Sequence, residues 1–207
     1  MQTHEHIDNI IFDLGNVLIP LRLDSINEIF GNLTKDSITP EQLGIKARDT
    51  FHAYETGKIS THQFLTNLKE YFKQGVSNSE IEMAWNMILG DFPVAHVEML
   101  KKLAPGYRLF VLSNTNELHA EKFETEVPGV THINDLFEKL HYSHIEGLRK
   151  PQMELYERVL KQNNLNPSET LFADDLPENL EPAEKLGIRT LHVTPGLDLP
   201  EWFRRQM

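Results

Sequence analysis

The sequence predicts an α/β protein, in which a doubly wound parallel sheet is interrupted after its first strand by an all-helical segment. From residue 92 onward, strand-like apolar runs alternate with helical segments, which is the pattern of a parallel sheet wrapped by helices. Between residues 23 and 89 the signals are those of helices alone. Three of the apolar runs are followed at once by polar side chains, and ligands of such sheets bind at the carboxyl ends of the strands.

The first strand is expected within residues 10–19, which are apolar on both sides of a short polar group. The helical segment that follows contains no convincing strand. Pro40, Thr61 and Ser79 are residues that begin helices, and Gly57 and Gly75 mark connections between them. Helices are therefore expected over residues 25–30, 40–54, 61–72 and 79–89.

The remainder of the chain predicts four more strands and four more helices. Asn116 is a suitable capping residue, Pro151 suits the first position of a helix, and Gly187 stops one. Strands are expected over residues 107–112, 141–144, 170–173 and 190–193. Helices are expected over residues 93–103, 117–126, 152–163 and 178–186.

This order of elements predicts two domains. Residues 1–20 and 92–207 form the sheet-containing core domain, and residues 21–91 form a helical cap domain. An insertion after the first strand lies above the strand ends, so it can act as a lid over a site there.

Composition excludes several classes of function. Acidic residues number 31 and basic residues 20, a formal charge of −11, which argues against nucleic-acid and anionic-membrane partners because both need a basic surface. A small anionic substrate remains compatible. The chain has no cysteine, which excludes disulfides and thiol catalysis. With no signal-peptide core and no long apolar run, the expected location is cytoplasmic; the oligomeric state is unknown from the sequence.

Four polar groups at strand or helix boundaries predict one site for phosphate and a divalent metal. They are Asp13, Ser113-Asn114, Lys150 and Asp174-Asp175. Adjacent carboxylates repel each other unless positive charge lies nearby, and a hard cation supplies that charge. A hydroxyl, an amide and a lysine can hold phosphate oxygens. Each group alone is also compatible with a turn, a solvated helix start or an exposed lysine, so the prediction depends on their joint order.

The same groups belong to four motifs in fixed order: Asp13-x-Gly15-Asn16-Val17, Ser113-Asn114, Lys150-Pro151 and Asp174-Asp175-x-x-x-Asn179. These motifs resemble those of the haloacid-dehalogenase-like (HAD) hydrolase superfamily, over nearly the whole chain. The segment Tyr54-Glu55-x-Gly57-x-Ile59-Ser60 resembles part of a cap in that superfamily. The combination is similar to the branch of α-D-glucose-1-phosphate phosphatases, close to epoxide-hydrolase N-terminal phosphatases. The resemblance implies a Rossmann-like core with an inserted helical cap.

The resemblance also implies how a phosphoryl group would be handled. Asp13 would attack phosphorus and become an aspartyl phosphate. Ser113 and Asn114 would bind the transferring phosphoryl oxygens, and Lys150 would neutralise the nucleophile and the phosphate together. The physical logic agrees, because a carboxylate cannot approach a phosphate dianion unless cations screen the repulsion.

For the metal, the resemblance implies Mg²⁺ bound by Asp13, Asp175 and the backbone carbonyl of Gly15. Asp174 belongs to the same metal site and, with Asn179, would orient the ligands, as groups around a metal generally do. The cation would supply part of the screening that the nucleophile needs.

One position departs from the superfamily's pattern. Phosphatases of the superfamily usually carry a second Asp two residues after the nucleophile, where this chain has Gly15. Loss of a general acid or base costs about 10²–10⁴ in rate. The substrate then has an acidic leaving group such as an anomeric sugar hydroxyl, or a cap residue substitutes, with His52 and Glu55 as candidates, or the protein is slow. His52 and Glu55 are also the candidate substrate-binding residues of the cap.

The leading hypothesis is a Mg²⁺-dependent phosphatase that acts on a small phosphorylated metabolite, such as a sugar phosphate. One alternative is a metal-independent 2-haloacid dehalogenase, whose halide leaves without a proton, although Asp174 and Asp175 favour a metal. The other alternative is a non-catalytic protein that binds a phosphorylated ligand in the same pocket.

Overall fold

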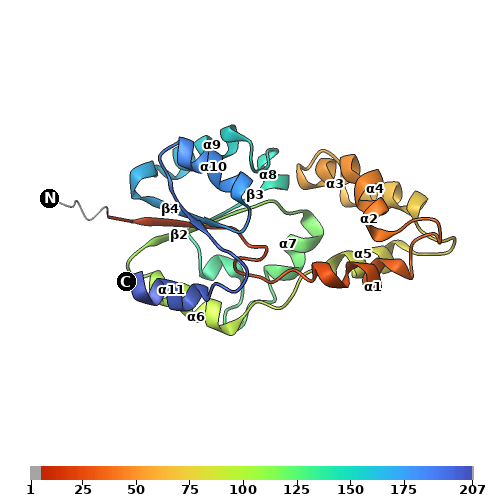
Figure 1. The fold of residues 1–207 in the computed structure, drawn as a ribbon, viewed down its shortest axis with the longest axis horizontal. Helices are drawn as coiled ribbons and strands as arrows, with labels where there is room; N and C mark the ends of the chain where they lie inside the picture. The colour runs from red at the N-terminus through yellow and green to blue at the C-terminus, as the bar shows by residue number, and fades with distance from the viewer. Residues whose placement is uncertain (1–5, 207) are drawn as a thin grey trace.

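The computed structural model describes residues 6–206, which form a five-stranded parallel sheet with helices on both faces and further helices at one end (Figure 1). The strands are β1 Asn9–Phe12, β2 Arg108–Ser113, β3 Lys139–Tyr142, β4 Thr170–Asp174 and β5 Arg189–His192. Their order across the sheet is β3-β2-β1-β4-β5, and every neighbouring pair is parallel. The doubly wound α/β architecture predicted from the sequence is confirmed.

Strand β1 lies at the centre of the sheet, and the chain winds outward from it in both directions. Ile10 is level with Leu109 of β2 on one side and with Leu171 of β4 on the other. From β1 the chain passes to β2 and β3, and then crosses over to β4 and β5. The winding therefore reverses between β1 and β4, and ligands of such sheets bind beyond the strand ends at that point.

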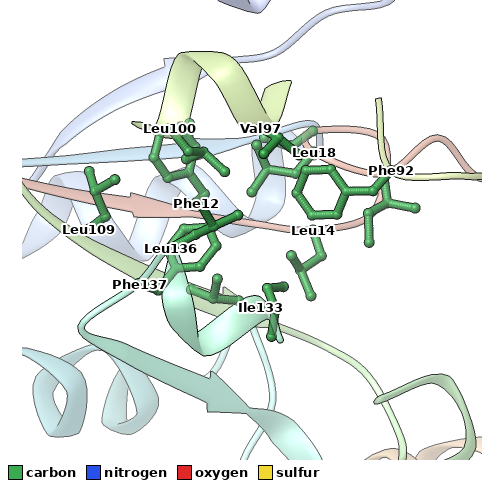
Figure 2. Packing of buried hydrophobic residues seen from close by; sticks show 14 of the residues in the cluster. Phe12, Leu14, Leu18, Phe92, Val97, Leu100, Leu109, Ile133, Leu136 and Phe137 are labelled. Atoms are coloured by element: carbon green, nitrogen blue, oxygen red, sulfur yellow. The ribbon is translucent and has the colours of Figure 1, made fainter. Parts of the chain in front are cut away.

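Alternate residues of β1 enter two separate hydrophobic clusters, because successive side chains of a strand point to opposite faces. Ile10 and Phe12 pack with residues of α6 and α11, and Figure 2 shows Phe12 beside Leu100 of α6. Ile11 packs with Leu155 of α9 and with residues of α10 on the other face. Both faces are covered, which explains why the strand is apolar throughout. The helices of this part of the chain are α6 Val94–Leu103, α7 Glu117–Phe123, α8 Ser143–Glu146, α9 Met153–Asn163, α10 Pro177–Lys185 and α11 Leu199–Gln206.

Residues 21–91, called here the helical block, lie at the end of the molecule toward which the strands run (Figure 1). The block has its own hydrophobic cluster, which includes the buried Phe64. Thr39, Ser60 and Ser77 each form a capping box at the start of a helix, which satisfies N–H groups that the helix leaves free. The helices are α1 Ile26–Gly31, α2 Pro40–Lys46, α3 Arg48–Glu55, α4 Thr61–Leu68 and α5 Asn78–Asn86. The predicted domain boundaries on either side of the block stay a prediction.

The block is attached to the sheet part of the molecule through the first turn of α7. Leu118 of α7 is buried within the block's hydrophobic cluster. Its backbone N–H donates to the Tyr54 hydroxyl at 3.1 Å, and Trp85 Nε1 donates to Asn116 Oδ1 at 3.2 Å. Because α7 follows β2 directly, the block is held close to the end of that strand.

Within the block, the prediction of one helix over residues 40–54 is wrong. Two helices, α2 and α3, meet at Ala47, whose φ of −94° and ψ of 5° interrupt the helix. Ala47 is buried at the bend, and the change of direction allows Leu43 and Tyr54 both to enter the block's cluster. Helix α5 begins at Asn78, directly after the capping residue Ser77 and one residue before the predicted start at Ser79.

Helices α4, α5 and α7 end three or four residues earlier than predicted, and further elements differ as well. The strand predicted at residues 141–144 lies two residues earlier, because Ser143 begins the short helix α8. Pro151 is not the first residue of α9: Gln152 is the capping residue, and the Lys150–Pro151 peptide is cis. Helix α11 was not among the predicted elements. Over residues 6–206, every helix is too short or too polar to span a lipid bilayer.

Candidate active site

The strand ends bring four predicted site residues to the point where the sheet's winding reverses. Asp13 follows β1 directly, Ser113 is the last residue of β2, and Asp174 is the last residue of β4. Lys150 enters from the loop between α8 and α9. All four residues are buried, so the three charges and the hydroxyl of Ser113 must be satisfied within the protein.

Lys150 lies between two of the carboxylates. Its side chain is 1% exposed, and its Nζ is 2.9 Å from Asp13 Oδ1 and 2.6 Å from Asp174 Oδ2. The ammonium also lies 5.5 Å from the centre of the Phe172 ring. Burial by itself would lower the pKa of Lys150, but Asp13 and Asp174 outweigh it and hold the pKa above its usual value. The site therefore contains a fixed, buried positive charge.

Asp13 is less well neutralised than its contact with Lys150 suggests. Burial raises the pKa of the Asp13 carboxyl to about 6; Lys150 opposes the rise, and Asp174 adds to it. Two buried carboxylates share one ammonium, so negative charge is in excess here. The backbone N–H of Asp13 donates to Ala173 O at 2.9 Å, which fixes the residue between β1 and β4.

Both carboxylate oxygens of Asp174 already have partners. Oδ1 accepts from the backbone N–H of Leu176 and from Asn179 Nδ2, each at 2.9 Å, and Oδ2 faces Lys150. This arrangement suits a residue that positions Lys150 and the start of α10. The orienting role expected for Asp174 and Asn179 is compatible with these contacts and stays a prediction.

Asp175 completes an acidic cluster that fits a hard cation. Oxygens of Asp13, Asp174 and Asp175 lie within 4.8 Å of one another. Burial raises the pKa of Asp175 as well, and Asn16 Nδ2 donates to its Oδ2 at 3.2 Å. Three carboxylates beside one lysine leave a deficit of positive charge, and oxygen ligands of this kind are those that Mg²⁺ prefers. Asp13, Asp175 and the carbonyl of Gly15 are the groups that would hold it.

The side chain of Asn114 has a different environment from the one expected. Its Nδ2 donates to Lys150 O at 3.0 Å, and its Oδ1 accepts from Lys150 N at 2.8 Å. The amide is thus engaged with the backbone of the lysine loop, and the phosphate-binding role expected for Asn114 stays a prediction. Ser113 keeps the predicted position beside it, at the end of β2.

Two residues of the site, Asn16 and Ser143, were given no role from the sequence, although Asn16 belongs to the first motif. Asn16 has a φ of +54°, and its Oδ1 accepts from Leu21 N while its Nδ2 reaches Asp175. Ser143 Oγ bonds both the N–H and the carbonyl of Thr115, so it fixes the loop after β2. Asn is one of the few residues that adopt positive φ readily, so the sequence could have indicated a special backbone position at Asn16. No local feature of the sequence indicates the role of Ser143.

A cavity of about 190 Å³ lies between the strand ends and the helical block. Its wall is largely apolar, and it includes Gly15, whose φ lies outside the left-handed region. A Cβ added at Gly15 would lie 3.0 Å from Cδ1 of Leu21, so Leu21 fills the space beside this position. The cavity is lined by Leu14, Gly15, Ile19, Leu21, Glu55, Trp85, Ile88, Leu89, Ser113, Asn114, Thr115, Asn116, His119 and Phe123.

The two residues predicted from the block, His52 and Glu55, both contact Arg149. Arg149 Nη2 lies 3.2 Å from Glu55 Oε2, and Arg149 Nη1 donates to His52 Nε2 at 3.2 Å. Burial and the neighbouring Arg149 lower the pKa of His52, so its ring is a neutral acceptor. Glu55 lines the cavity; His52 is exposed and is not part of the cavity wall.

Comparison with known proteins identifies a family and several relatives. A family model described as a haloacid dehalogenase-like hydrolase matches residues 7–187. The chain is 27% identical over 197 residues to a D-ribitol-5-phosphate phosphatase of Bacteroides thetaiotaomicron, covering 93% of this chain and 94% of that protein. It is 31% identical over 189 residues to a sesquiterpene phosphatase of Aspergillus oryzae, covering 90% of each.

Among solved structures, the chain is similar to a HAD family enzyme of Bacteroides thetaiotaomicron in complex with magnesium and inorganic phosphate. The TM-score is 0.88 with 32% sequence identity, and the match covers 96% of this chain and 100% of the other. The likeness therefore includes both the sheet and the helical block.

Proposed function

The chain belongs to the haloacid dehalogenase-like hydrolase family, and from this premise we propose that it is a Mg²⁺-dependent phosphatase working through an aspartyl-phosphate intermediate. Its substrate is a small phosphorylated metabolite. The magnesium and phosphate complex of the similar Bacteroides enzyme and the phosphatases among the relatives support the proposal.

One observation carries most of the proposal: Lys150 is buried between Asp13 and Asp174, beside the further carboxylate of Asp175. A buried lysine shared by two carboxylates is not explained by stability alone, since apolar side chains of similar size in its place often give a fold that is equally stable. A phosphate-transfer site needs this arrangement, because a carboxylate nucleophile must meet a dianionic phosphate.

In the proposed reaction, an oxygen of Asp13 attacks phosphorus and the bond to the leaving alcohol breaks. Lys150 stays beside Asp13 and offsets the charge of the incoming phosphoryl group. Ser113, with backbone N–H groups of the loop after β2, binds the phosphoryl oxygens. Water then attacks the phosphorus of the aspartyl phosphate, which releases inorganic phosphate and restores the carboxylate.

Asp13, Asp175 and the carbonyl of Gly15 would hold Mg²⁺, and Asp174 would contribute by orienting this group. When bound, the cation supplies charge screening for the nucleophile and the phosphate. Asn16 restrains Asp175 through its 3.2 Å hydrogen bond, so the chain holds this carboxylate in place for the metal.

The cavity favours a short substrate. Its volume is about 190 Å³, and its wall is largely apolar. The class named for the Bacteroides relative, a polyol phosphate, fits that space better than a sesquiterpene phosphate does. We assign the helical block, residues 21–91, the role of a cap that closes this cavity and selects the substrate.

A direct test compares p-nitrophenyl phosphate, ribitol 5-phosphate and a 2-haloacid as substrates, each with Mg²⁺ and with EDTA. We expect hydrolysis of the phosphates only, dependent on Mg²⁺, and its loss in Asp13→Asn, whose neutral amide cannot form the acyl phosphate. Halide release in EDTA would support the metal-independent dehalogenase. Phosphate binding without turnover would support the non-catalytic alternative.

A further inference from the structure

We propose that Glu55 of helix α3 delivers a proton to the leaving oxygen of the substrate and later takes one from the attacking water. This inference depends on the proposed phosphatase function, and it assigns to the helical block a group that takes part in the chemistry.

The reaction needs such a group. An alkoxide leaves phosphorus poorly unless it is protonated as the bond breaks. Gly15, on the wall of the cavity, offers no side chain, and the space beside it is filled by the hydrocarbon end of Leu21. The side of the cavity next to Gly15 is therefore apolar and cannot supply the proton.

Glu55 is the one carboxylic acid on the cavity wall, within the part of the chain that the structure describes. His119 also lines the cavity, but burial lowers its pKa to about 4, so its ring is neutral. Its Nε2 is paired with Trp85 O at 3.1 Å and its Nδ1 with Asn116 Nδ2 at 3.2 Å. His119 and Asn116 are thus engaged with each other, and Glu55 is the group that remains for proton transfer.

The Glu55 side chain is partly buried, with 23% of it exposed, and its carboxyl is incompletely paired. Its Oε2 is shielded from solvent and has no hydrogen bond, although Arg149 Nη2 lies 3.2 Å away as an ion-pair partner. Burial raises the pKa of Glu55, and Arg149 opposes that rise. Burial favours the protonated acid before transfer, and Arg149 stabilises the carboxylate that remains after it. His52 contacts the same arginine, and burial together with Arg149 lowers the pKa of its ring.

Over the two steps of the reaction, Glu55 donates one proton and takes up one proton. As Asp13 bonds to phosphorus, the phosphorus–oxygen bond to the leaving group breaks, and that oxygen takes the Glu55 proton to become an alcohol. In the second step Glu55 takes a proton from water while the water oxygen bonds to phosphorus and the bond to Asp13 breaks. Glu55 is then protonated again, as at the start.

The test uses the full chain with Mg²⁺ and the isosteric variant Glu55→Gln. For ribitol 5-phosphate we expect kcat/KM to fall by about 10²–10⁴-fold. For p-nitrophenyl phosphate, whose leaving group needs no proton, the first turnover should stay within about tenfold of wild type. The second step still lacks its base, so one equivalent of nitrophenol should appear in a burst, followed by slow turnover.

The controls separate this role from folding and from substrate binding. Glu41→Gln makes the same change on the exposed surface of α2 and should behave as wild type. Glu55→Asp keeps a carboxyl and should restore part of the ribitol 5-phosphate activity. Equal losses on both substrates without a burst, or no loss on either, would overturn the role of Glu55. Wild-type protein that hydrolyses neither phosphate would instead overturn the proposed function itself.

Discussion

The side chain of Asn114 and the backbone of Lys150 are joined by two hydrogen bonds, of 2.8 and 3.0 Å, between segments that are 36 residues apart in the chain. The amide donates to the lysine carbonyl and accepts from the lysine N–H. The end of β2 therefore fixes the backbone from which the buried ammonium reaches Asp13 and Asp174.

Replacing Asn114 by Ala should leave both backbone groups of Lys150 without these partners. We expect a loss of about 1–3 kcal/mol in the free energy of unfolding. Because Lys150 is then less well placed, kcat should fall more than KM rises. Urea denaturation and steady-state kinetics measure the two effects, with Asn67→Ala, on the exposed surface of α4, as the control. Unchanged stability and kcat would show that the two hydrogen bonds do not position the lysine.

Lys150→Met should be strongly destabilising in the absence of metal. The substitution leaves Asp13 and Asp174 buried without their shared cation, and breaking a buried ion pair costs about 3–5 kcal/mol. Urea denaturation in EDTA at neutral pH measures it. Lys161→Met, at an exposed position of α9, is the matched control and should change stability little. A loss no larger than that of the control would contradict the view that the lysine neutralises this cluster.

Mg²⁺ should stabilise the fold, because a ligand that binds only the folded state raises its stability. We expect a Tm that rises with Mg²⁺ concentration in the wild type, and a much smaller rise in Asp175→Ala. Differential scanning calorimetry measures both. Asp198→Ala, at an exposed acidic position that caps α11 and is not part of the acidic cluster, should show the same rise in Tm with Mg²⁺ as wild type. An equal rise in all three proteins would place the cation elsewhere.

Mg²⁺ affinity should fall as the pH drops through about 6, the raised pKa of Asp13 in the metal-free protein, because a protonated carboxyl is a poor ligand. Isothermal titration calorimetry at pH 5 and pH 7.5 checks this. The same shift has an opposite consequence for the metal-free fold. Protonated Asp13 contributes stability that is fully present below the unfolded pKa of 3.8 and is lost as the pH rises through about 6. An affinity independent of pH over this interval would exclude Asp13 as a ligand.

Gly15→Asp should restore activity to Glu55→Gln on ribitol 5-phosphate, because it introduces a new acid beside the same cavity. The backbone tolerates a side chain at Gly15, but Leu21 Cδ1 at 3.0 Å must move. We therefore expect the largest recovery, about 10- to 100-fold within the range of an acid–base contribution, when Leu21→Ala is added. In otherwise wild-type protein the gain should be small, since Glu55 already acts. A large gain from Gly15→Asp in otherwise wild-type protein, without recovery in Glu55→Gln, would indicate that no acid operates in the wild type.

The sequence predicted the sheet and the main site residues because both depend on local patterns. Apolar runs followed by Asp13, Ser113 and Asp174 mark strand ends, and parallel strand ends converge whatever the details of packing. The acidic pair of Asp174 and Asp175 likewise required a neighbouring positive charge. These features need no knowledge of which side chains meet.

Other features depended on contacts between distant segments and could not be predicted. The amide of Asn114 has no local preference for the backbone of Lys150, so its two hydrogen bonds to that backbone could not be predicted. The bend at Ala47 follows from the packing of two helices against a shared cluster, which helical periodicity does not reveal. Helix α11 did carry a local signal, since Leu199, Trp202 and Phe203 recur at helical spacing.

The attachment of the helical block has a consequence for exchanging such blocks between relatives. Leu118 lies in the α7 sequence but is buried in the block's cluster, and the Tyr54 hydroxyl accepts from its backbone N–H. In a chimaera that joins this sheet to a foreign block at residues 20 and 92, Leu118 would come from one protein and the rest of its hydrophobic cluster from another. The foreign block would have to supply a hydrophobic pocket that fits Leu118 and a hydrogen-bond acceptor for the Leu118 backbone N–H. Successful recombination is expected only when α7 is transferred together with the block.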